Sequence, residues 1–145
     1  MKNCLKNKLS KIKISNNWHW VVIGIVIILS CLPLFKPGYY KIHDQEHIVR
    51  LYEFDQALKS GQIPPRWGAN LGYGYGYPIF VFYPPLIYVA SEIFYLIGFS
   101  LITSVKLMLF IGTVIGGISM YFLAKKFVNK FGATVAAIAF LLTPY

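Results

Sequence analysis

The sequence predicts an all-α, polytopic membrane protein. Hydrophobic residues make up 57% of its 145 residues and charged residues only 13%, against about 25% charged residues in an ordinary soluble domain. The basic residues flank long apolar runs, which is typical of membrane spans and not of the aromatic-studded basic face of a nucleic-acid-binding protein. The net charge of +9 therefore predicts membrane lipid, and no nucleic acid, as the partner.

The first apolar run, residues 18–35, predicts transmembrane helix 1. Eighteen residues make about 27 Å of helix at ~1.5 Å per residue, which just spans a bilayer. The basic tail before it, residues 1–17, is predicted to be cytoplasmic because it carries five lysines, namely Lys2, Lys6, Lys8, Lys11 and Lys13. A lipoprotein signal ending at Cys31 is the alternative, but the apolar run continues past Cys31, where a lipoprotein would become polar.

Residues 36–103 are predicted to form an external loop that contains two helices. The first covers 44–60, because Asp44 is a natural N-cap and Ser60-Gly61 a natural end. At 100° per residue, its apolar side carries Ile48, Leu51, Tyr52, Phe54 and Leu58, and its opposite side carries Glu46, Val49, Arg50, Glu53 and Ala57. Asp55 also projects into the apolar face, without the explanation that capping gives for Asp44.

The second loop helix is predicted over 84–98, in the outer membrane interface. Only about fifteen residues follow Pro84-Pro85, some 22 Å of helix, which is short for a span. If the apolar segment 79–98 crossed fully, the next span would also place the lysines of loop 125–130 outside, against the positive-inside tendency. An interfacial helix instead leaves that loop in the cytoplasm.

Residues 104–124 predict transmembrane helix 2, and residues 131–145 predict the start of transmembrane helix 3. Small residues favour close helix packing in lipid, and the two segments carry them at Gly112, Gly116, Gly117, Ala133, Ala136, Ala137 and Ala139. The chain ends while it is still apolar, so we expect a truncated protein. The predicted location is the cell membrane, with several passes and a cytoplasmic N-terminus.

The acidic residues are clustered where chemistry is expected. Four of the five, Asp44, Glu46, Glu53 and Asp55, lie within twelve positions of the external loop. A glycosidase needs two carboxylates about 5 to 9.5 Å apart, whereas Asp44 and Asp55 would be about 16 Å apart along one helix. Hydrolysis is therefore disfavoured. Transporters place ionisable side chains within their membrane spans, and the predicted spans contain almost none.

Three segments carry a resemblance to known proteins: His43-Asp44-Gln45-Glu46-His47, Leu58 to Trp67, and Gly74 to Leu86. They are similar to the bacterial membrane-protein family described as 6-pyruvoyl-tetrahydropterin-synthase-related, a label that implies no pterin chemistry here. More distantly, the layout of about residues 20–145 resembles the GT-C glycosyltransferases, which include the oligosaccharyltransferase catalytic subunit, protein O-mannosyltransferases and lipid A aminoarabinose transferases. The implied fold is the N-terminal part of a GT-C-like helical bundle.

The resemblance implies that an acidic residue near the outer end of the first span acts where a polyprenyl-phosphate-linked sugar meets its acceptor. The matching residue is Asp44, which would take the acceptor proton or hold a divalent metal ion. His43, Glu46 and His47 are its candidate supporting residues, and a metal site of three ligands cannot be assembled from the sequence alone. The resemblance also implies a second acidic external loop after the third span.

The leaving phosphate calls for a cation, for which Arg50 and Arg66 are the candidates. Candidate lipid or sugar contacts are Trp67, Tyr75, Tyr77 and Tyr83. The sequence leaves plainer alternatives open: Asp44 as a helix cap only, the arginines as headgroup-binding cations, and the tyrosines as interfacial anchors. A non-enzymatic multi-pass protein, such as a transporter fragment or an assembly subunit, is the alternative function.

Overall fold

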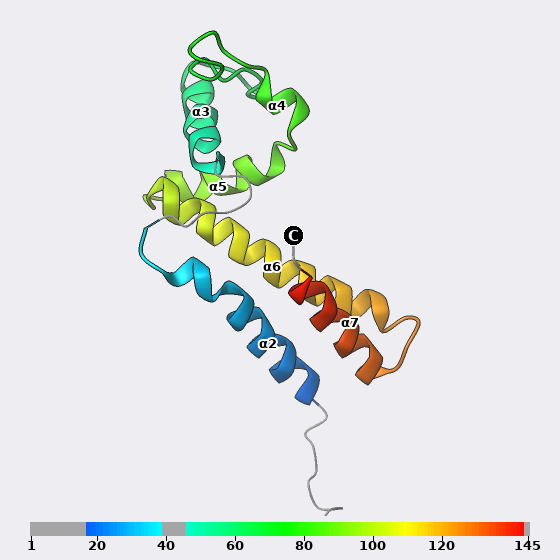
Figure 1. Ribbon diagram of the computed structural model, residues 1–145. Coiled ribbons are helices and arrows are strands. Elements are labelled where there is room, and N and C mark those ends of the chain that lie inside the picture. The colour runs from blue at the N-terminus through cyan, green and yellow to red at the C-terminus, as the bar shows by residue number, and fades with distance from the viewer. Residues whose placement is uncertain (1–16, 39–45, 144–145) are drawn as a thin grey trace, which may run out of the picture. The chain divides into compact units, whose positions relative to one another are not determined.

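The computed structural model describes residues 17–38 and 46–143, and every regular element in these two ranges is helical (Figure 1). The helices are α2 (Trp18–Cys31), η1 (Leu32–Phe35), α3 (His47–Lys59), α4 (Ile79–Phe82), α5 (Leu86–Leu96), α6 (Leu101–Ala124) and α7 (Lys130–Leu142). The all-α prediction is confirmed for this part of the chain. The chain divides into two compact units, 1–31 with 113–145, and 32–112.

Two helical segments, Trp18–Phe35 and Leu101–Ala124, are long and apolar enough to cross a membrane. Most of their residues face outward from the protein, whereas a core helix of a soluble protein would be mostly buried. The first has the predicted bounds. The second begins three residues before the predicted 104, because Ser100 accepts a hydrogen bond from the Thr103 backbone N–H at 3.2 Å and so caps the helix at that point.

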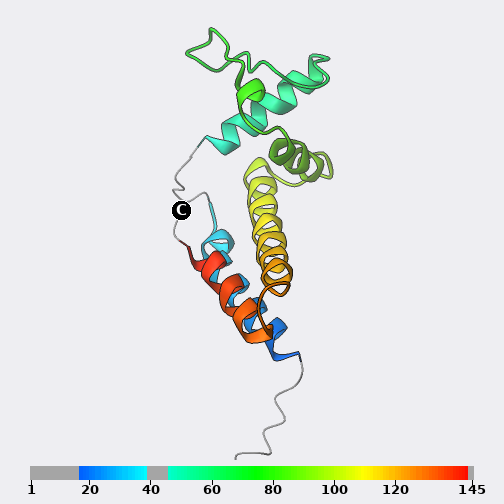
Figure 2. The same cartoon turned by 90° about the vertical axis from the view of Figure 1, so that its right-hand side faces the viewer.

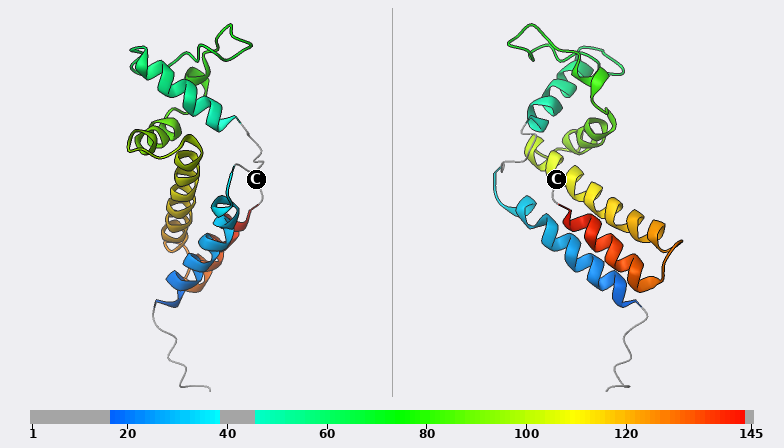
Figure 3. Two further views of the ribbon diagram at one scale, coloured as in Figure 1. Left: turned by 90° about the vertical axis from the view of Figure 1, so that its left-hand side faces the viewer. Right: turned by 45° about the vertical axis from the view of Figure 1, so that its right-hand side comes forward.

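In the first unit, α2 packs along α7 (Figure 3). The buried residues of α2 recur every fourth position and form one stripe: His19, Ile23, Ile27 and Cys31. The facing stripe of α7 consists of small side chains, Ala133, Thr134 and Ala137, which let the two backbones approach closely. The His19 ring stacks on Tyr121 of α6, with 5.1 Å between ring centroids and 10° between planes.

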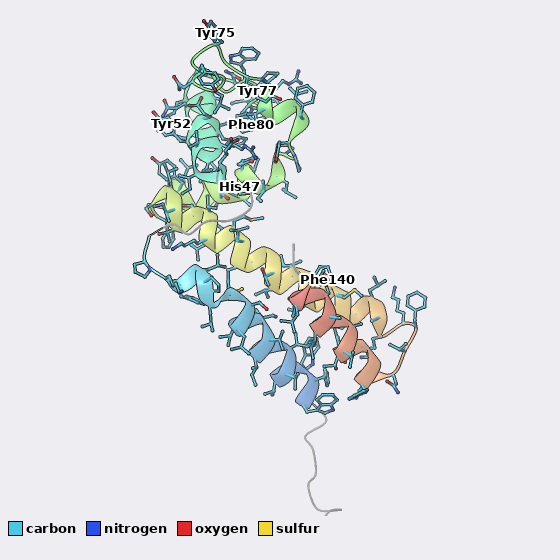
Figure 4. The ribbon with its side chains drawn as sticks, viewed as in Figure 1. His47, Tyr52, Tyr75, Tyr77, Phe80 and Phe140 are labelled. Carbon is cyan, nitrogen blue, oxygen red and sulfur yellow. The ribbon has the colours of Figure 1, made fainter. Side chains whose placement is uncertain are left out.

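The predicted packing role of the glycines in α6 is confirmed at two of three positions. A Cβ added at Gly116 would come within 3.0 Å of the Phe140 ring, and one at Gly117 within 3.0 Å of the Leu141 side chain. Phe140 is labelled on α7 in Figure 4. A Cβ at Gly112 would meet open space, so this glycine makes no close contact.

In the second unit, residues of α3, α4 and α5 form a hydrophobic core. The core consists of Phe54, Ile79, Phe80 and Tyr88. Phe54 meets Phe80 edge to face at 5.2 Å, and Phe80 meets Tyr88 in the same way at 5.5 Å, the geometry that aromatic rings prefer. Figure 4 labels Phe80 beside α3, where it joins α4 to the core.

The loop helix predicted over 44–60 is observed as His47–Lys59. Asp44, its predicted N-cap, lies outside the described residues, and the helix as described is preceded by Glu46, whose side chain makes no capping hydrogen bond. The C-terminal end agrees with the prediction, since Gly61 has a φ of +88°. That left-handed conformation favours glycine and ends a helix.

Segment 79–98 forms two short helices, α4 and α5, on either side of Tyr83-Pro84-Pro85. The predicted helix 84–98 is thus observed as Leu86–Leu96, eleven residues, or about 16 Å, too short to span a bilayer. In Figure 2, α5 is seen nearly end-on while the beginning of α6 runs across the view, so the two helices cross. The orientation of α5 in a membrane stays a prediction.

Candidate functional site

A groove of ≈ 550 Å³ lies beside the first turn of α3. We call it the Arg50 groove, and its walls come from α3, from the loop after α3 and from the region of α4. It is lined by Glu46, Val49, Arg50, Leu71, Gly72, Tyr77, Ile79 and Tyr83. Four of the predicted site residues, Glu46, Arg50, Tyr77 and Tyr83, therefore meet in one place.

Arg50 is the central charge of this groove and is only 6% exposed. Its Nη2 donates a hydrogen bond to Glu46 Oε2 at 2.8 Å, and its Cζ lies 4.1 Å from the centre of the Tyr83 ring. An ion pair on one side and an aromatic face on the other fix the plane of the guanidinium. The side chain of Glu46 is 69% exposed, so the carboxylate can move away while the arginine stays.

Helical spacing placed Arg50 and Glu53 on the side of the helix opposite its apolar face. Both are nevertheless buried, at 6% and 2% exposure, because the segment after α3 folds back over this side. The Glu53 carboxylate accepts hydrogen bonds from the Asn70 side-chain Nδ2 at 2.8 Å and from the Asn70 backbone N–H at 3.1 Å. Glu53 thus anchors the loop that forms one wall of the groove.

The same loop is closed by a two-residue bridge between Gly68 and Tyr77, whose backbone groups exchange hydrogen bonds of 2.9 Å. The closure brings Tyr77 to the groove and leaves Tyr75 at the outer edge of the loop, 89% exposed (Figure 4). Trp67 is 45% exposed and its ring lies against Gly76. Neither Tyr75 nor Trp67 lines the Arg50 groove.

Two further predicted residues lie elsewhere in the second unit. Arg66 is exposed and lines a separate hollow with Pro64, Pro65 and Phe80. His47 lies at the start of α3, its ring 6.3 Å from that of Tyr88, and is not in the Arg50 groove. Among the described residues, Arg50 lines the groove that also holds Glu46, Tyr77 and Tyr83, and Arg66 does not.

His43 and Asp44, the predicted catalytic residue and its neighbour, lie outside the described residues. The metal prediction at Asp44 is therefore untested. Within 17–38 and 46–143 no group of three histidine, cysteine or acidic side chains is close enough to hold a metal ion.

Two buried carboxyl groups lie outside the predicted site, Asp55 on α3 and Glu92 on α5, which are 2% and 3% exposed. Helical spacing places Asp55 on the apolar face of its helix but does not reveal Glu92 as its neighbour. Lys59 Nζ donates to Asp55 Oδ2 at 2.7 Å, so the Asp55 carboxylate is compensated. Among the described residues neither oxygen of Glu92 has a hydrogen-bond partner. Burial, followed by the Asp55 charge, raises the pKa of Glu92 to about 7.

Two glycines test whether the loop closed by the Gly68–Tyr77 bridge has one fixed shape. Gly74 and Gly76 both have positive φ, +87° and +81°, but a Cβ at Gly76 would overlap the Trp67 indole, whereas one at Gly74 would meet nothing within 4 Å. Gly74→Ala pays only the left-handed backbone cost of about 1 kcal/mol. Gly76→Ala must also displace the indole, so we expect trypsin to cleave after Arg66 several-fold faster in Gly76→Ala than in Gly74→Ala. Equal rates in the two variants would show that the Trp67 contact does not hold the loop.

Comparisons with known proteins returned no match: no family model, no curated protein and no solved structure is significantly similar to this chain.

Proposed function

We propose that this chain forms part of an integral membrane glycosyltransferase, which moves a sugar from a polyprenyl-phosphate donor to an acceptor at the outer face of the membrane. The proposal rests on the resemblance of the external loop to GT-C enzymes. The observation that carries it furthest is the Arg50 groove, where an oriented guanidinium, a movable carboxylate and two tyrosines share one open cavity.

Arg50 is suited to bind a phosphate because its side chain is already held in one conformation and loses little entropy on binding. A guanidinium presents five N–H donors in a rigid fork that fits phosphate oxygens, and here Tyr83 and Glu46 hold that fork in place. A phosphate oxygen can take the place of the Glu46 carboxylate as the acceptor of the Arg50 N–H groups, one anionic acceptor for another.

Tyr77 and Tyr83 supply aromatic surface beside this cation. Aromatic rings with a hydroxyl group offer both an apolar face and a polar edge, which suits a sugar ring with its C–H faces and hydroxyl rim. Asp44 stands two positions before Glu46 in the sequence.

In the proposed reaction, an acceptor hydroxyl oxygen attacks the anomeric carbon of the donor sugar. The bond between that carbon and the phosphate oxygen breaks, and the polyprenyl phosphate leaves with the electron pair. The acceptor proton passes to the Asp44 carboxylate. Arg50 neutralises the charge that develops on the departing phosphate. A divalent ion at Asp44 is the alternative way to lower the pKa of the acceptor hydroxyl.

Binding of undecaprenyl phosphate to the chain in lipid nanodiscs tests the phosphate site, with Arg50→Gln and Arg66→Gln as a matched pair. Loss of a charge-assisted hydrogen bond of about 1.5–3 kcal/mol should weaken binding about tenfold or more in Arg50→Gln. Arg66→Gln should bind as the wild type does. Glu46→Gln removes the competing carboxylate and should bind at least as tightly as the wild type.

Three outcomes oppose the proposal. Weak binding by Arg66→Gln alone would move the phosphate to the Arg66 hollow. Unchanged binding by Arg50→Gln, with an unchanged circular dichroism spectrum, would leave the groove without a phosphate role and favour a non-enzymatic membrane protein. Weaker binding by Glu46→Gln would show that Glu46 supports the ligand instead of competing with it.

A further inference from the structure

The second unit has another cavity of ≈ 550 Å³, which we call the lysine pocket. It is formed where the end of the first candidate span meets the beginning of the second. Its apolar walls are Leu34, Phe35, Ile102, Leu107 and Phe110, and its polar edge includes Lys36, Ser100, Thr103 and Lys106. The rings of Phe35 and Phe110 lie 6.2 Å apart, edge to face.

Among the described residues, those that line the pocket include two lysines and no acidic residue. Lys106 Nζ donates to the backbone oxygen of Lys36 at 2.7 Å, which holds the ammonium group at the pocket edge and leaves two of its three donors for another acceptor. The amino end of α6 lies at the same edge, where Ser100 caps the helix. The partial positive charge of a helix N-terminus adds to that of the two lysines.

An apolar cavity with a cationic edge fits a ligand that has both a hydrocarbon part and an anionic group. A free phosphate would satisfy the lysines and leave the apolar walls empty, and a neutral hydrocarbon would leave the charges unpaired. The volume is that of pockets that hold small organic ligands. The walls belong to the two segments that are long and apolar enough to cross a membrane, so lipid chains would surround this cavity in a bilayer.

We propose that the lysine pocket binds an anionic phospholipid, with its phosphate at Lys36 and Lys106 and the upper part of an acyl chain between Phe35 and Phe110. This site is distinct from the Arg50 groove, since the two share no lining residue. Its occupant is a membrane lipid that the protein keeps and does not transform. The proposal stands without the glycosyltransferase proposal.

The test is native mass spectrometry of the chain extracted from vesicles of phosphatidylcholine that contain phosphatidylglycerol. The double variant Lys36→Gln/Lys106→Gln should retain about tenfold less phosphatidylglycerol than the wild type, because each lysine contributes to attraction of the anionic headgroup. The control Lys125→Gln/Lys126→Gln removes the same charge from the loop after α6 and should retain as much as the wild type. Phe110→Ala should also lose phosphatidylglycerol, although it keeps both charges.

Equal retention in the two lysine double variants would overturn the proposal, as would equal retention of phosphatidylcholine and phosphatidylglycerol by the wild type. Displacement of the lipid by millimolar inorganic phosphate at constant ionic strength would show an ion site in place of a lipid site. Undecaprenyl phosphate that binds here in preference to phosphatidylglycerol would assign the pocket to the donor lipid and so overturn the phospholipid proposal. Undecaprenyl phosphate binding that is lost in Arg50→Gln but kept in Lys36→Gln/Lys106→Gln belongs to the Arg50 groove and leaves the phospholipid proposal standing.

Discussion

Replacement of Asp44 by asparagine is expected to slow sugar transfer about a hundredfold or more, because the acceptor hydroxyl loses its proton acceptor or its metal ligand. Asparagine keeps the size of aspartate and much of its capping ability, so the free energy of unfolding should change by about 1 kcal/mol or less. The measurement is transfer of label from lipid-linked sugars prepared from the same membranes that hold the protein.

The matched control is Glu46→Gln, which removes a carboxylate two positions away. Glu46 pairs with Arg50 and its side chain is 69% exposed, so this variant should fold normally and lose much less of the transfer rate than Asp44→Asn does. An Asp44→Asn protein that folds and transfers sugar at the wild-type rate would leave Asp44 with only the helix-cap role.

Folding of the second unit is expected to weaken as the pH rises from about 4.5 to about 7, because of Glu92. The pKa of this buried carboxyl is raised from 4.5 to about 7, so the folded state binds the proton more tightly than the unfolded state does. The stabilisation is fully present below pH 4.5 and is lost as the pH passes through about 7. The shift corresponds to about 3 kcal/mol.

The charged groups near Glu92 determine which variants test the predicted pH dependence of stability. Asp55 raises the pKa of Glu92, and Lys59 lowers it. Tyr95 of α5 lies beside Lys59, 6.0 Å from its Nζ. The Asp55 carboxylate in turn raises the pKa of Lys59, mainly through their hydrogen bond.

Thermal unfolding in nanodiscs at pH 5 and pH 8 measures the effect. The wild-type unfolding midpoint should fall by about 5 to 10 °C between these pH values as a result of Glu92. Glu92→Gln should lack this decrease and should be more stable than the wild type at pH 8. Lys59→Gln should enlarge the fall, since it removes the charge that lowers the Glu92 pKa. A Glu92→Gln variant with the wild-type pH dependence would contradict the carboxyl pair.

The sequence alone determined the features that depend on neighbours along the chain. The first candidate span followed from a largely apolar run of eighteen residues, the end of α3 from Ser60-Gly61, and the break between α4 and α5 from Pro84-Pro85. Apolar length, glycine at positive φ and proline geometry act within a few residues, so each can be predicted without knowing the rest of the fold. The close contacts of α6 at Gly116 and Gly117 agree with the packing role predicted for small residues, but Gly112, one helical turn away, makes none.

The tertiary structure alone decided which polar side chains meet. Helical periodicity placed Arg50 and Glu53 opposite the apolar face of their helix, but it could not show that a loop returns at residue 70 to cover them. Asp55 and Glu92 are 37 positions apart, and Lys36 and Lys106 are 70 apart. Burial and charge pairing at such separations depend on how helices cross, and the period of any one helix contains no information about its partner.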